Sequence, residues 1–337
     1  MKTFPDFPLF IVSSFHSVIS KDRTTNCTWE LTYRCNAQCG FCSYWKNPTD
    51  PNEELQLSEV KQGLNAIYRY GCRLVHFSGG EPTLRDDLED ILSHAAKKRI
   101  WTSLVTNGSR LDRKRIREFR KAGLDNLFIS LDFIEREAHD KQRKMKGLFD
   151  EVLSGLECLG TDFIGGHRTA GIMCVVSDIN LDSAERLAEL AKKNGVFITY
   201  QLYHPQKSEN EMFRIKDIQK VSSTLLRLKM ENWNVISSKS YISGMKNFHG
   251  NHKPCSAGRK YFSVDPLGFL HPCVDLPQVG HILRDPVSVI RSPKALSTVR
   301  QCKGCWYSFR GEADHALSIR GSFEKIAQFG RIIFENR

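Results

Sequence analysis

Three cysteines that lie within eight residues, Cys35, Cys39 and Cys42, constrain this chain more than any other feature. Thiolates this close, separated by polar residues and a glycine, bind metal because the backbone can curl to bring three sulfurs to one centre. Three ligands are one fewer than a structural zinc ion or a fully ligated 4Fe–4S cluster takes. The spacing therefore predicts a metal centre with one position left open to another molecule.

A second motif, Gly79-Gly80-Glu81-Pro82, follows an apolar, strand-like run. Two glycines at the end of a strand let the backbone approach a ligand closely, and Glu81 supplies an anionic hydrogen-bond acceptor beside them. Together with the three-then-two spacing of the cysteines and the aromatic Phe41 before the last of them, this motif resembles the signatures of the radical S-adenosylmethionine (radical SAM) superfamily.

This resemblance implies a role for each of these residues. Cys35, Cys39 and Cys42 would hold three irons of a 4Fe–4S cluster, and S-adenosylmethionine (SAM) would bind the fourth iron. The Gly-Gly-Glu-Pro segment would hold the amino group of SAM. The cofactor-binding residues implied by the two motifs are Phe41, Gly79, Gly80, Glu81 and Pro82.

From about residue 28 the chain alternates β-rich runs with amphipathic stretches, which predicts βα units and a parallel sheet. The expected strands are 28–33, 72–77, 100–106, 126–132, 169–176 and 196–202, and the expected helices are 57–70, 86–98, 110–122, 149–159 and 180–193. Six such units match the partial (β/α)6 TIM-like barrel of radical SAM enzymes. The predicted fold class is therefore α/β, with the chemistry on the loops after the strands.

Polar residues at three further strand ends suit a nucleoside ligand. They are Thr106 and Asn107, Ser130 and Asp132, and Gln201. By the resemblance, the first four would contact the carboxylate and ribose hydroxyls of SAM, and Gln201 would lie near its adenine. The alternative is that Asn107 only forms a turn and Asp132 only caps a helix.

Four later cysteines, Cys255, Cys273, Cys302 and Cys305, flank a hairpin signal with Gly268 in its turn. Their order resembles the shortened SPASM extension of radical SAM enzymes, called the twitch domain, which contains a β-hairpin and a helix. The resemblance implies a second, fully ligated 4Fe–4S cluster. A four-cysteine zinc site is the alternative, because zinc ribbons use similar spacings.

The chain therefore divides into five predicted parts. They are an N-terminal extension (1–24), the barrel (25–205), a helical bridge (206–250), the twitch-like domain (251–315) and a C-terminal amphipathic helix (316–337). The prolines near the N-terminus argue against a signal peptide, and no apolar run reaches the ~18 residues that span a bilayer. These observations predict a cytoplasmic protein.

The formal net charge of +11 suggests an acidic partner or substrate, although a basic surface can also lack specific meaning. The C-terminal stretch 316–337 is basic and amphipathic, so it predicts peripheral membrane contact or packing against the barrel. Because the basic residues are spread along the chain, no nucleic-acid partner is expected.

The first hypothesis for function is a radical SAM oxidoreductase that acts on a small molecule, such as a sugar, an aminocyclitol or an anionic or lipid-linked precursor. It would cleave SAM reductively to a 5′-deoxyadenosyl radical, abstract hydrogen, and oxidise the substrate with help from the second cluster. A flavodoxin or ferredoxin would donate the electron. The alternatives are a radical SAM maturase of a ribosomally made peptide or protein, and a non-catalytic iron–sulfur or zinc protein.

Overall fold

A computed structural model describes residues 26–247, 255–302, 304–308 and 310–312. The expected N-terminal extension (1–24) and C-terminal amphipathic helix (316–337) lie outside these described residues, so both remain predictions.

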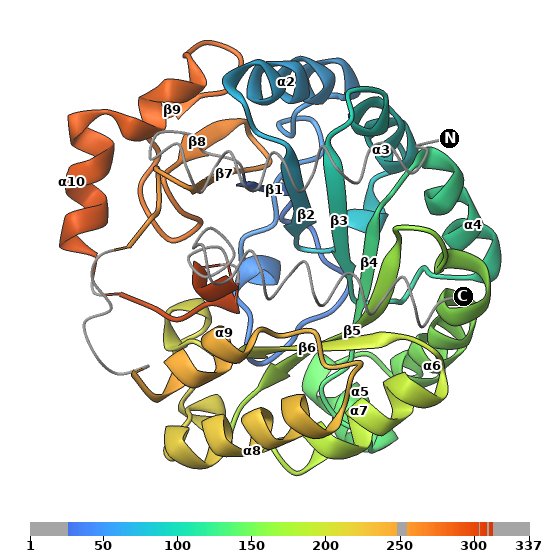
Figure 1. The fold of residues 1–337 in the computed structure, drawn as a ribbon. Coiled ribbons are helices and arrows are strands. Elements are labelled where there is room, and N and C mark those ends of the chain that lie inside the picture. Colours follow the sequence, from blue (N-terminus) through green and yellow to red (C-terminus); the bar gives the residue numbers. More distant parts are fainter. Residues whose placement is uncertain (1–25, 248–254, 303, 309, 313–337) are drawn as a thin grey trace.

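Six parallel strands form the centre of the molecule, in the order of the sequence (Figure 1). They are β1 (Asn26–Thr32), β2 (Leu74–Gly79), β3 (Trp101–Thr106), β4 (Asn126–Ser130), β5 (Thr169–Val176) and β6 (Phe197–Leu202). Each pairs in parallel with the next. All six predicted strands are present, with ends shifted by three residues or fewer, and the predicted α/β fold class is confirmed.

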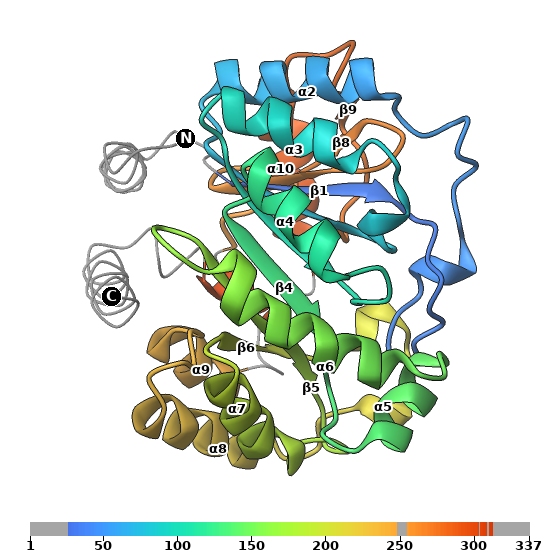
Figure 2. The ribbon, with the colours of Figure 1, turned by 90° about the vertical axis from the view of Figure 1, so that its right-hand side faces the viewer.

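Helices cover the outer face of this curved sheet (Figures 1 and 2). They are α2 (Leu57–Tyr70), α3 (Leu88–Lys97), α4 (Arg113–Ala122), α6 (Leu148–Cys158) and α7 (Ser183–Lys193). Their buried residues recur at helical spacing, as Val60, Leu64 and Ile67 do on α2. These side chains form one continuous core with the outward-facing strand residues.

The helix ends follow the local sequence. The Asp112 side chain accepts a hydrogen bond from the Arg115 amide at the start of α4, and Gly123 ends that helix in the left-handed region. After α6 a π-helical turn (Leu159–Phe163) leads to β5. A short helix that the sequence pattern did not predict, α5 (Arg136–Arg143), lies between β4 and α6.

The stretch predicted as a helical bridge contains α8 (Ile218–Glu231) and α9 (Lys239–Gly244). Three 3-10 turns, Pro205–Lys207, Glu211–Phe213 and Met245–Asn247, flank them. Of these, the first two follow β6 directly and reach the site described below.

The C-terminal segment adds three short strands to the same sheet. β7 (Tyr261–Val264) pairs in parallel with β1, and β8 (Phe269–His271) and β9 (Gly280–His281) continue antiparallel. A 3-10 turn (Val287–Arg291) and α10 (Pro293–Gln301) follow. The predicted hairpin around Gly268 is present, but the hydrogen bonds between β7 and β1 join it to the barrel sheet rather than to a sheet of its own.

No helix among the residues that the structure describes is both long enough and apolar enough to cross a bilayer.

Candidate active site and second cysteine site

The loop that carries Cys35, Cys39 and Cys42 is fixed from two sides after it leaves β1. The amides of Gln38 and Gly40 donate to the carbonyls of Arg143 and Gln142 at the end of α5, at 3.1 and 3.2 Å. The Asn210 amide donates from the loop after β6 to the Gly40 carbonyl at 3.1 Å. The three-cysteine loop therefore has a defined shape that depends on α5 and on the β6 loop.

The thiols of this loop lie close enough to interact electrostatically. Burial raises the pKa of Cys35 to about 11 and that of Cys39 to about 12, and Cys42 adds to both shifts. The amide of Ala37 also points at the Cys35 sulfur, at 3.4 Å. The Cys35 and Cys39 thiols are therefore protonated at neutral pH until a metal displaces the protons.

Arg143 places a positive charge against this loop. Its guanidinium lies 5.2 Å from the Phe41 ring centroid, and its charge opposes the rise in the pKa of Cys39. The Phe41 ring also packs edge-to-face on Phe213, with 5.9 Å between centroids. Phe41 thus lies between Arg143 and the β6 loop, beside the cysteines.

Asp132 holds Arg143 in place. Its Oδ2 accepts two hydrogen bonds from Arg143, at 2.6 and 3.0 Å, and its Oδ1 accepts one from the Val175 amide at 2.9 Å. The side chain is completely buried. The expected contact of Asp132 with a ribose hydroxyl stays a prediction.

Gly79 and Gly80 are needed for contact between two parts of the backbone. A Cβ on Gly79, whose φ is +128°, would lie 2.2 Å from the Thr32 carbonyl oxygen, and one on Gly80 would lie 2.2 Å from that of Arg34. The amides of Gly80 and Glu81 donate to these same two carbonyls, at 2.7 and 2.8 Å. The motif therefore fixes the end of β1 directly before Cys35.

Glu81 joins the motif to the end of β3. Its carboxylate accepts hydrogen bonds from the amide and hydroxyl of Thr83, the hydroxyl of Thr106 and the amide of Asn107, at 2.6–3.0 Å. Three of these contacts fall on Oε1 and one on Oε2. Glu81 thus braces the motif against the end of β3. Pro82 begins the buried 3-10 turn that follows.

The other predicted strand-end residues differ in their contacts. Asn107 donates to Asn36 inside the cysteine loop at 2.8 Å. Ser130 is buried at the end of β4, and the described residues give its hydroxyl no hydrogen-bond partner. Gln201 accepts a hydrogen bond from Ser308 at 3.0 Å, which attaches β6 to the C-terminal segment. The predicted contacts of these residues with SAM stay predictions.

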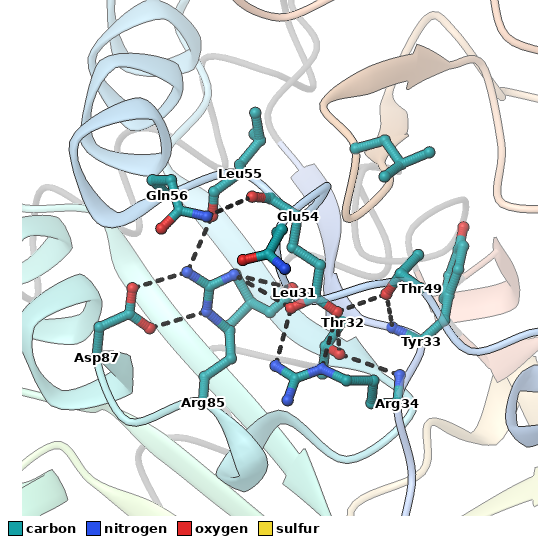
Figure 3. Close-up of polar contacts among 12 residues, drawn as sticks. Leu31, Thr32, Tyr33, Arg34, Thr49, Glu54, Leu55, Gln56, Arg85 and Asp87 are labelled. Atoms are coloured by element: carbon teal, nitrogen blue, oxygen red, sulfur yellow. Dashed lines mark hydrogen bonds and ion pairs between the residues drawn. The ribbon is translucent and has the colours of Figure 1, made fainter.

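A buried polar clamp supports the same region from behind (Figure 3). The Glu54 carboxylate accepts from the hydroxyls of Thr32 and Thr49 and forms an ion pair with Arg34 at 2.9 Å. Arg85 binds the carbonyls of Leu31 and Leu55 at 3.2 and 3.0 Å. No sequence motif indicated this clamp, because its members are common residues that lie far apart in the sequence. Leu31 and Arg85, for example, are 54 residues apart.

The four C-terminal cysteines also come together. Cys255, Cys273, Cys302 and Cys305 line one pocket. Burial raises the pKa of Cys273 well above its ordinary value, and Cys305 and Cys255 add to this shift because they lie nearby. The Gly304 amide points at the Cys302 sulfur at 3.4 Å.

Polar residues connect the two cysteine sites. The Lys207 ammonium donates to the Tyr44 hydroxyl and to Asp275, both at 3.2 Å. Tyr44 in turn donates to the buried Glu30 carboxylate. Burial opposes the charge of Lys207, but Tyr307, Asp275 and Glu30 raise its pKa overall. Because Tyr44 lies two residues after Cys42 and Asp275 two after Cys273, Lys207 ties one site to the other.

Both cysteine sets contain the donors that a 4Fe–4S cluster takes, because each sulfur of such a cluster site binds its own iron. The first set has three thiols in one loop beside Arg143, and the second has four thiols around one pocket. Across the described ranges, no three Cys, His, Asp or Glu side chains converge closely enough to hold one metal ion.

Residues 29–191 match the sequence model of the Radical SAM superfamily. The chain is 28% identical over 272 residues to the mycofactocin maturase MftC of Mycolicibacterium smegmatis, which covers 77% of this chain and 67% of that protein. It is 37% identical over 137 residues to the Fe-coproporphyrin III synthase of Methanosarcina barkeri. That match covers 41% of this chain, which spans about a third (34%) of the length of that relative.

The fold resembles that of SuiB from Streptococcus suis, solved with its precursor peptide SuiA. The TM-score is 0.69 with 13% sequence identity, over 86% of this chain and 70% of that chain. At this identity the likeness concerns the fold alone.

Proposed function

Because residues 29–191 form a radical SAM domain, we propose that this chain is a radical SAM enzyme that modifies a ribosomally made peptide or protein. The observation that carries the proposal is the three-cysteine loop, which β1, α5 and the Gly-Gly-Glu-Pro segment hold in one shape. Three cysteine ligands leave one iron of a 4Fe–4S cluster free for SAM.

Cys35, Cys39 and Cys42 would hold the cluster, which when bound would supply the electron for the reductive cleavage of SAM. The protein provides position and charge. Arg143 lies against the loop with its positive charge, and the Gly-Gly-Glu-Pro segment would hold the amino group of SAM. The aromatic side chains of Phe41 and Phe213 keep this side of the loop apolar.

Cys255, Cys273, Cys302 and Cys305 would hold a second, fully ligated 4Fe–4S cluster, which suits an overall oxidation of the substrate. A twitch-like domain over 251–315 and a low-potential donor such as flavodoxin or ferredoxin belong to the same proposal. The oxidoreductase class and a cytoplasmic location also remain proposals.

From the sequence alone, a small-molecule substrate was the first hypothesis and a peptide or protein substrate was an alternative. The similarity to the maturase MftC favours the reverse order. A small anionic molecule remains the second candidate. It is supported by the similarity of the barrel to an Fe-coproporphyrin III synthase and by the net charge of +11.

Anaerobic reconstitution tests the enzymatic class. We expect about eight irons per chain, and with dithionite the protein should convert SAM into 5′-deoxyadenosine and methionine. Cys42→Ala should abolish 5′-deoxyadenosine formation and lose about half of the iron, whereas Cys72→Ala, in the core, should retain both. Iron-loaded protein that leaves SAM intact would contradict the proposal.

The substrate class is tested by incubating the reconstituted enzyme with short peptides encoded beside its gene and with an iron–coproporphyrin. A SAM-dependent mass change in a peptide supports the first candidate. A change only in the porphyrin supports the second.

A further inference from the structure

The pocket of the four C-terminal cysteines also contains a buried arginine, Arg310. Its side chain is only 2% exposed. The guanidinium donates to the Cys305 carbonyl, and its Nη1 lies 4.0 Å from the Cys305 sulfur. Arg310 therefore brings a buried guanidinium to the Cys305 side of this pocket.

The segment around Arg310 is firmly placed. Arg310 lies over the Trp306 ring, 5.7 Å from its centroid, and the Trp306 indole donates to the Tyr241 carbonyl at 2.9 Å. A Cβ on Gly244 would lie 2.1 Å from the Trp306 ring, so α9 and this ring are in close contact. Because Trp306 packs on α9, α9 fixes the ring against which Arg310 lies.

Two opposite charges among the described residues also meet at the pocket. Asp275 lines it, and the ammonium of Lys207 lies 3.2 Å from that carboxylate. The Tyr261 hydroxyl lies 3.0 Å from the Cys255 sulfur. Arg310 therefore adds a positive charge to the cysteine pocket on the side of Cys305.

We propose that Arg310 is a positioning residue that raises the reduction potential of the four-cysteine centre. The inference rests on the proposed function, in which this centre takes up one electron as the substrate is oxidised. A centre that gains an electron becomes more negative by one unit, and a buried cation stabilises that state more than the oxidised one. Without Arg310, the centre would accept the electron less readily.

The test measures this potential directly. In a full-length background with Cys35, Cys39 and Cys42 replaced by alanine, only the four-cysteine centre holds iron. EPR-monitored redox titration then gives its midpoint potential. Arg310→Met should lower the ratio of reduced to oxidised centre at a fixed potential at least tenfold, a shift of about 59 mV for one electron. Arg310→Lys, which retains the charge, should stay near the parent.

Arg227→Met is the matched control, because it also removes one positive charge but from the exposed face of α8, where Arg227 pairs with Glu185 and Glu231. It should leave the potential unchanged. If Arg310→Met does not fold, Arg310→Gln replaces it, since glutamine can still donate to the Cys305 carbonyl.

Two outcomes would overturn the inference. An unchanged midpoint potential in Arg310→Met or Arg310→Gln, with full iron content, would refute the role of Arg310. The proposed function would then stand, because the unaltered enzyme would still cleave SAM. Zinc or no metal at the four cysteines of the background protein would refute the second cluster of the proposed function as well, which metal analysis alone reveals.

Discussion

Single residues in this site act mainly by holding other parts of the protein. Gly79 and Gly80 were predicted to let the backbone approach a ligand, and the structure shows that they let it approach Thr32 and Arg34. Glu81 was predicted as an anionic acceptor beside these glycines, and its carboxylate accepts hydrogen bonds from Thr83, Thr106 and Asn107. The motif located the right residues, but the contacts that explain them involve residues distant in sequence.

Gly80→Ala should therefore damage the three-cysteine site. The new methyl group would overlap the Arg34 carbonyl, so the end of β1 must move and Cys35 with it. We expect loss of most of the iron bound at that loop, measured by iron analysis in a background with the four C-terminal cysteines replaced by alanine. Gly195→Ala is the control, because it incurs left-handed strain of about 1 kcal/mol but meets no atom within 4 Å. Equal iron in both variants would contradict this account.

His139 should make the stability depend on pH. Burial, and then the charge of Arg143, lower its pKa from 6.5 to about 3. The unfolded chain therefore binds more protons than the folded chain between these values, and the free energy of unfolding falls as the pH falls from 6.5 towards 3.

Between pH 7 and pH 4, the free energy of unfolding should fall less in the His139→Leu variant than in the parent. The difference between the two falls should be roughly 3 kcal/mol. Urea unfolding at both pH values measures this difference. Parallel pH profiles for the two proteins would mean that His139 does not titrate as its burial implies.

At the scale of elements, α5 shows where sequence patterns fail. Its sequence from Arg136 to Arg143 has almost no apolar residues, and its two buried residues are His139 and Arg143. A search for hydrophobic periodicity cannot find a helix whose inner face is polar. The barrel strands and outer helices were predictable because their inner faces are apolar. The ion pair of Arg143 with Asp132 and the clamp around Glu54 depend on contacts between distant residues.

Asp140 connects α5 to the next helix, and its loss should weaken this junction. Its carboxylate accepts hydrogen bonds from the amides of Gly147 and Phe149, at 2.6 and 2.8 Å, and so caps α6. Asp140→Ala should lower the free energy of unfolding by about 1–2 kcal/mol. Asp150→Ala, which removes a half-exposed carboxylate from α6, should cost less than about 0.5 kcal/mol. Urea denaturation compares the two, and equal effects would argue against the cap.

At the scale of the whole molecule, residues 255–312 join the two ends of the six-stranded barrel. β7 extends the sheet beyond β1. On the other side, Ser308 bonds Gln201 of β6, and the Glu312 carboxylate accepts from the Ser238 amide before α9. The sequence predicted a separate small domain here. It could not show the pairing of β7 with β1, because nothing in a four-residue strand specifies its partner.

Because β7 pairs with β1, we expect the two strands to resist local unfolding to a similar degree. Amides of β7 should exchange hydrogen with a protection similar to those of β1, and not with the lower protection expected of an independent hairpin. Native-state hydrogen exchange followed by mass spectrometry tests this, with α10, which pairs with no strand, as the internal comparison. Fast exchange of 261–264 beside slow exchange of 26–32 would contradict it.

The same arrangement affects the order of events as the protein is made. The ribosome completes all six barrel strands, and with them the first cysteine loop, before it begins the piece that spans the opening between β1 and β6. Until that last piece docks, β1 lacks the partner strand β7 and β6 lacks its bond to Ser308. We therefore expect docking of this piece to be the last step in forming the sheet.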